Sequence, residues 1–263
     1  MNGLKIRIDG TEISLENTTP AAPDHFQEIQ NMSAAISNES DMIAKQIKAV
    51  ALLSDVKTVE SFGYTATESV GNAAAVAANN IKNKLIAFFK RIALFFQKIG
   101  QTVAIKIATL FKNQAGKDFG NTLKEVSAYG FKLSQEGIKL SSDNAPNAVE
   151  QAKQKQAAGA AVVSCVSTGI KLVSMAKNKD PNDKTIEVIL ANVSKLLLSI
   201  TTASNEQDAI AKSNEIKDKL LKQFIPAVEK AKDFSQAAAA AGTVTVTAEG
   251  EAGHNDAGNA PAE

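Results

Sequence analysis

Histidine and cysteine, which most often carry nucleophilic, acid–base or metal chemistry, are nearly absent from this sequence of 263 residues. The two histidines, His25 and His254, have no serine or cysteine partner within a catalytic motif. The cysteine and histidine spacing of a zinc site is missing, and the phrase "GQTVAIK" lacks the Lys-Ser/Thr ending of a phosphate-binding loop. We therefore expect a protein that is not an enzyme and that uses no cofactor or metal.

An uneven charge distribution is the most distinctive feature of the chain. Segment 79–117 contains no Asp or Glu, and its apolar residues recur at intervals of four and three, which predicts a basic amphipathic helix. The basic residues that could contact DNA or a membrane are Lys82, Lys84, Lys90, Arg91, Lys98, Lys106 and Lys112. The apolar stripe is Leu85, Phe88, Phe89, Ile92, Phe95, Phe96 and Ile99.

Three interpretations of this segment are open. The stripe could pack into the core of a bundle while the lysines stay in solvent. It could instead lie in the headgroup region of a membrane, with a pore-forming assembly as a special case. The lysines could also neutralise nucleic-acid phosphates without reading sequence. Acid-rich sequence before the segment offers charge pairing within or between chains.

The elements around this segment predict a mainly α protein, an elongated helical bundle of about six helices. Residues 1–16 alternate apolar and polar side chains around an Asp-Gly turn, which predicts a short β-hairpin. Residues 17–24 form a proline-containing linker, residues 25–236 the helical domain, and residues 237–263 a flexible acidic tail.

Glycine and proline mark the expected interruptions of the helices. We expect Gly130 and Gly137 to interrupt one helix, Gly100 to bend another, and Pro226 to kink the last, which spans residues 206–234. The phrase "KDPNDK" predicts a break between two helices.

The composition indicates a core made mainly of aliphatic side chains. Trp is absent, only two Tyr occur, and Cys165 lies in the apolar run "AAVVSCVS", which predicts a buried thiol. The N-terminus lacks the apolar region of a signal peptide, and no apolar run approaches the ~20 residues of a membrane span. These features predict a cytoplasmic or particle-enclosed protein.

Three phrases resemble internal head proteins of large tailed bacteriophages: "KIRIDGTEISLE", "VESFGYTATESVGNAA" and "NIKNKLIAFFKRIALFFQKI". The resemblance covers about the first half of the chain. It implies a non-enzymatic virion protein located in the head interior, and in the host cytoplasm during assembly. The partners it implies are other virion proteins and DNA bound without sequence specificity, and a host membrane or further copies of the chain fit the same pattern.

The resemblance also implies processing by a maturation protease that cleaves after a glutamate. Glu16, Glu68 and Glu249 fit its loose pattern, and Glu16 fits best because it precedes the linker. Cleavage at Glu16 would remove the hairpin and make residues 1–16 a packaging segment. An ordinary surface glutamate is the alternative at each position.

Overall fold

The chain is mainly helical, which confirms the predicted helical bundle. Glu16, most of the 17–24 linker and the 237–263 tail lie outside the described residues, so the predictions made for them are not tested. The computed structural model describes residues 4–8, 11–15, 24–59, 67–145, 147–180 and 183–233.

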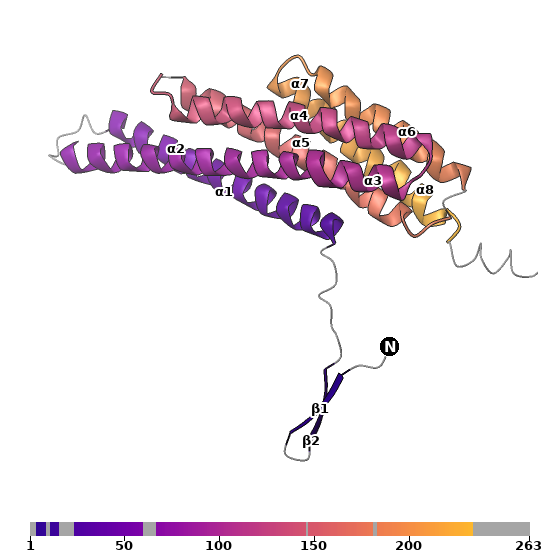
Figure 1. Cartoon of the computed structure of the whole chain (residues 1–263). Coiled ribbons are helices and arrows are strands. Elements are labelled where there is room, and N and C mark those ends of the chain that lie inside the picture. The colour runs from indigo at the N-terminus through magenta and orange to yellow at the C-terminus, as the bar shows by residue number, and fades with distance from the viewer. Residues whose placement is uncertain are drawn as a thin grey trace, which may run out of the picture.

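In the described part of the chain, six helical rods run side by side (Figure 1). Three of them continue from an α-helix through a π or 3₁₀ segment. The rods are α1 (His25–Val59); α2 (Thr67–Lys98), η1 (Ile99–Val103) and α3 (Ala104–Leu110); α4 (Gln114–Ser142); α5 (Ala148–Ala176); α6 (Lys184–Leu198) and η2 (Ser199–Thr202); and α7 (Glu206–Lys219), η3 (Leu220–Phe224) and α8 (Ile225–Lys230).

Two short strands precede the bundle. β1 (Leu4–Ile8) and β2 (Thr11–Leu15) pair antiparallel, with Leu4 opposite Leu15 and Ile6 opposite Ile13. Their side chains are outside the description, so the β-hairpin of residues 1–16, its apolar face and its packing partner stay predictions.

Helices α4 and α5 lie at the centre of the bundle. Helix α4 packs against α2, α3, α5 and α6, and α5 packs against α1, α2, α4 and α7. Side chains that accept a hydrogen bond from the backbone fix the starts of three helices: Asn113 for α4, Asp183 for α6 and Asn205 for α7. The predicted break at "KDPNDK" is confirmed, because α5 ends before it and Asp183 caps the next helix.

The basic helix has other bounds than the predicted segment 79–117, because it begins earlier, at Thr67, and ends earlier. It ends at Leu110, after a π-helical turn that contains Gly100, and α4 begins at Gln114. The last rod likewise ends at Lys230 rather than at residue 234, and a π segment ends at Phe224, two residues before Pro226. Proline lacks the N–H that would continue the backbone hydrogen bonds of the helix, and the wider π turn accommodates this missing donor.

The expected interruption at Gly130 and Gly137 is wrong, because α4 continues unbroken from Gln114 to Ser142. Both glycines are buried and face phenylalanine rings of α2: Gly130 faces Phe96 and Gly137 faces Phe89. A glycine in a helix costs only about 1 kcal/mol, which close packing of a large ring readily offsets. These glycines therefore allow close helix packing.

The prediction that no segment is long and apolar enough to span a membrane is not upheld in the described part. Helix α5 and the segment 184–202 pass a test of length and hydropathy. Within the bundle, 61% of the apolar window of α5 and 39% of the window of the second segment are buried. Core helices of soluble proteins pass the same test.

Candidate functional site

The apolar stripe of α2 lies in the core of the bundle. All seven of its residues, Leu85 to Ile99, are completely buried. The four phenylalanines form two edge-to-face pairs, with ring centroids 5.6 Å apart for Phe88 and Phe89 and 5.2 Å apart for Phe95 and Phe96. In this fold the stripe matches the core interpretation. A membrane could contact it only if α2 left the bundle.

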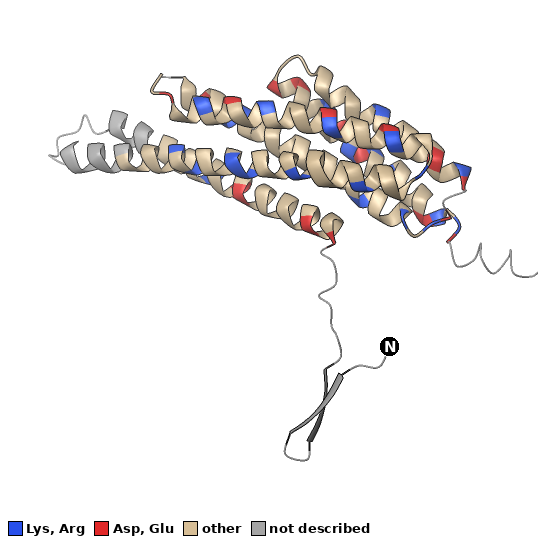
Figure 2. Ribbon diagram, in the orientation of Figure 1, with Lys and Arg blue, Asp and Glu red and all other residues tan. Residues whose placement is uncertain are grey.

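One row of the predicted basic residues faces α1. The two helices run antiparallel, and Figure 2 shows acidic positions on α1 beside basic positions on α2. The acid-rich sequence before the basic segment therefore supplies its partners within the same chain. The three pairs are Lys84 with Gln46 (2.8 Å), Arg91 with Glu39 (2.9 Å) and Lys98 with Glu28.

Polar side chains also join α1 to α5. Gln30 donates to the main-chain oxygen of Ser167 (2.8 Å) and accepts from its hydroxyl (3.1 Å). Further along, Gln156 donates to the main-chain oxygen of Ser40 (2.9 Å). Helix α1 is thus held by buried isoleucines on one face and by hydrogen bonds along both of its edges.

The other predicted basic residues differ in how freely their charges face solvent. The Lys82 ammonium donates to the turn after α4, whereas the Lys106 ammonium lies 5.8 Å from the Phe26 ring centroid. Lys90 and Lys112 are exposed, and within the described residues neither has an ion pair or hydrogen bond. These two lysines are the members of the predicted set most available to an external anion.

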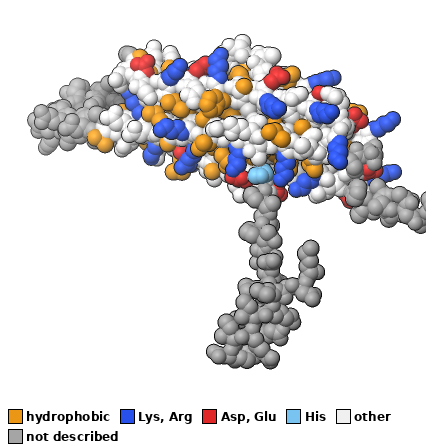
Figure 3. Space-filling view, viewed as in Figure 1, with side chains coloured by type: hydrophobic (Ala, Val, Ile, Leu, Met, Phe, Trp, Pro, Cys, Tyr) orange, Lys and Arg blue, Asp and Glu red, His pale blue; other side chains and the backbone are white. Residues whose placement is uncertain are grey.

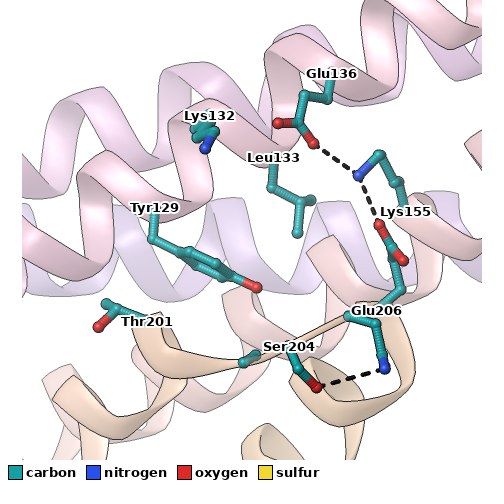
Figure 4. Close-up of a pocket in the computed structure, with 10 residues that line it drawn as sticks. Tyr129, Lys132, Leu133, Glu136, Lys155, Thr201, Ser204 and Glu206 are labelled. Carbon is teal, nitrogen blue, oxygen red and sulfur yellow. Dashed lines mark hydrogen bonds and ion pairs between the residues drawn. The ribbon is translucent and has the colours of Figure 1, made fainter.

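A polar pocket between α4, α5 and the start of α7 was not predicted from the sequence (Figure 4). It has a volume of about 410 Å³. The Lys155 ammonium lies between two carboxylates, 2.7 Å from Glu136 and 2.6 Å from Glu206. Tyr129 and Lys132 of α4 line the same pocket.

The electrostatics of this pocket indicate a structural ion-pair network. Burial alone would lower the pKa of Lys155, but its hydrogen bonds to Glu136 and Glu206 outweigh burial and raise it. The hydrogen bond from Lys155 lowers the pKa of Glu206. Burial, together with the Glu206 charge, raises the pKa of Tyr129. All three groups keep their ordinary charge at neutral pH, so the pocket ties three helices together without an activated acid, base or nucleophile.

The histidine and cysteine found in the described part do not form a reactive site. Cys165 is completely buried, and burial raises its thiol pKa to about 12, as expected for an unreactive core residue. The His25 ring lies 3.7 Å from a Glu28 oxygen. No group of metal-ligating side chains occurs among the described residues, and His254 is not one of them.

Comparison with known proteins identifies no relative of this chain: no family model, no curated protein and no solved structure matches it.

Proposed function

We propose that this chain is a non-enzymatic structural protein of a tailed-bacteriophage virion. It is made in the host cytoplasm, packed into the head with the genome and delivered into the host with the DNA. Its partners are other virion proteins, packaged DNA bound without sequence specificity, and further copies of the chain.

The observation that carries this proposal is the acid-free segment 79–117, whose apolar stripe from Leu85 to Ile99 lies in the bundle core while Lys90 and Lys112 face solvent. Such a surface can neutralise phosphates without a sequence-reading element. The resemblance of the first half of the chain to internal head proteins supports the same assignment.

The finer features of the fold belong to this proposal. Residues 1–16 act as a packaging hairpin that is removed after Glu16, and residues 237–263 form a mobile acidic tail. Both flank the helical domain, which stays intact after processing because its helices begin at His25.

Particles tested before and after triggered genome release provide the decisive experiment. The proposal expects the chain in full particles at many copies, and its loss together with the DNA while shell proteins stay behind. Retention in emptied particles would contradict delivery with the genome. Absence from full particles would contradict the virion assignment.

A membrane-active, pore-forming role is the second candidate, favoured by the basic and apolar faces of α2. It requires the buried stripe to leave the core, and therefore the release of α1 from its pairs with α2 and α5. Dye release from anionic vesicles tests this role. A disulfide that locks α1 to α2 would abolish release if the stripe must emerge.

A further inference from the structure

Three large apolar side chains are exposed on the surface formed by α2, α3 and α4. Leu94 is 58% exposed, Ile105 54% and Phe131 41%. The ring contacts Phe96–Gly130 and Phe89–Gly137 show that α2 and α4 run antiparallel, which brings Leu94 level with the turn of α4 that carries Phe131. Figure 3 shows hydrophobic side chains lying among lysines on this side of the bundle.

A shallow groove lies between the two helices on this surface. Its volume is about 390 Å³, and Phe96, Ala128 and Phe131 give it a mainly apolar lining. Lys124 stands at its edge with Gln97 and Gln101. Of the three exposed apolar side chains, Phe131 lines this groove.

Two lysines lie among these apolar side chains. Lys90 of α2 and Lys124 of α4 are exposed, and neither has an ion pair in the described part of the chain. Segment 79–110 carries no acid, whereas α4 carries Asp118, Glu125 and Glu136, of which Glu136 is bound by Lys155. We call this surface the α2–α4 face, defined by Leu94, Ile105, Phe131, Lys90 and Lys124.

We propose that the α2–α4 face docks onto a lipid bilayer that contains anionic phospholipid. Lys90 and Lys124 complement lipid phosphates, and Leu94, Ile105 and Phe131 enter the boundary between headgroups and acyl chains. Charge complementarity alone would equally suit DNA, but a phosphate backbone offers no apolar counterpart for three exposed hydrophobic side chains. The buried stripe stays in the core, so docking requires no unfolding and is distinct from pore formation.

Vesicle flotation with the full-length chain tests this proposal. Vesicles of phosphatidylcholine are compared with vesicles that also contain phosphatidylglycerol. The double variant Lys90→Gln/Lys124→Gln is expected to weaken binding to the anionic vesicles about 25-fold, at about fivefold per lysine. Leu94→Ser is expected to weaken it about fivefold, since roughly half a leucine side chain is removed from the lipid.

The junction of α7 and η3, in the middle of the last rod, supplies control positions. Lys219, Leu221 and Lys222 present the same residue types there, outside the α2–α4 face. This part of the rod packs mainly on α5, and Lys219 and Lys222 pair with Glu215 and Asp218. Lys219→Gln/Lys222→Gln and Leu221→Ser are expected to bind the anionic vesicles as the wild type does. Because every substituted side chain is exposed or half-buried, circular dichroism verifies that each variant is folded.

Several results would overturn the proposal: equal binding to both kinds of vesicle, equal loss in the control variants, or a Leu94→Ser variant that binds like the wild type. If the lysine variant lost affinity for a short DNA duplex while Leu94→Ser lost no affinity for vesicles, the face would be a nucleic-acid contact. The particle experiment is independent of these outcomes, so the two proposals can fail separately.

Discussion

Substituting Gly137 by alanine tests how closely α2 and α4 pack. A Cβ added at Gly137 would lie 2.3 Å from Cε1 of Phe89, closer than real Cβ atoms come to other atoms. The Phe89 ring is completely buried and packs edge-to-face on Phe88, so it has little room to withdraw. The two helices must therefore separate or the ring must leave its preferred rotamer.

The expected magnitude is the balance of two opposing effects. Alanine gains about 1 kcal/mol of helix propensity over glycine. Overpacking of a tight core costs about 1–3 kcal/mol or more, and this severe overlap belongs at the upper end of that range. Gly137→Ala should thus lower the free energy of unfolding by about 2 kcal/mol, which corresponds to roughly 4–8 °C in Tm for a domain of this size.

Thermal and denaturant unfolding followed by far-UV circular dichroism measures this effect. Gly169→Ala is the matched control, because its Cβ would lie 3.0 Å from the flexible end of Leu197 and the variant should stay within about 1 kcal/mol of wild type. Phe89→Leu should partly rescue Gly137→Ala by shortening the opposing side chain. A Gly137→Ala protein as stable as wild type, or more stable, would refute the close packing described here.

Three further predictions concern the thiol, the polar pocket and the attachment of α1. Cys165 should react with iodoacetamide only as fast as the chain unfolds. Because the pKa of its thiol is raised from 9.0 to about 12 in the folded chain, the free energy of unfolding should fall as pH rises above 9. Lys155→Met should lower Tm at neutral pH, and this deficit should shrink as pH falls below 4.5, because the lowered pKa of Glu206 stabilises the wild type only while that carboxylate is ionised. Arg91→Gln should lower the free energy of unfolding by less than about 1 kcal/mol, because it removes only the exposed ion pair with Glu39. Amide hydrogen exchange in α1 should nevertheless become faster, and added salt should have the same effect on the wild type.

Periodicity predicted the stripe of α2 but not what covers it. A spacing of four and three residues is the same for a core helix and for a helix at a membrane surface, so the sequence left both interpretations open. The deciding contacts are tertiary: acidic residues on α1 pair with Arg91 and Lys98, and the glycines of α4 receive Phe89 and Phe96.

The two features that the sequence did not predict both depend on distant residues. From its neighbours in the sequence, Gly137 is expected to interrupt a helix. Its actual role depends on Phe89, which lies on another helix. Lys155 is 19 residues from Glu136 and 51 from Glu206, and no local motif links them. Only the packing of α4, α5 and α7 brings these three side chains together.

Terminal-peptide mass spectrometry on purified virus particles tests the central claim most directly, because it reports presence in the particle and processing together. The account predicts an abundant chain whose first residue is Asn17, which would establish a processed head component and make residues 1–16 a packaging segment. An intact Met1 in the particle would contradict the cleavage at Glu16 alone. Absence of the chain from particles would contradict the virion assignment itself.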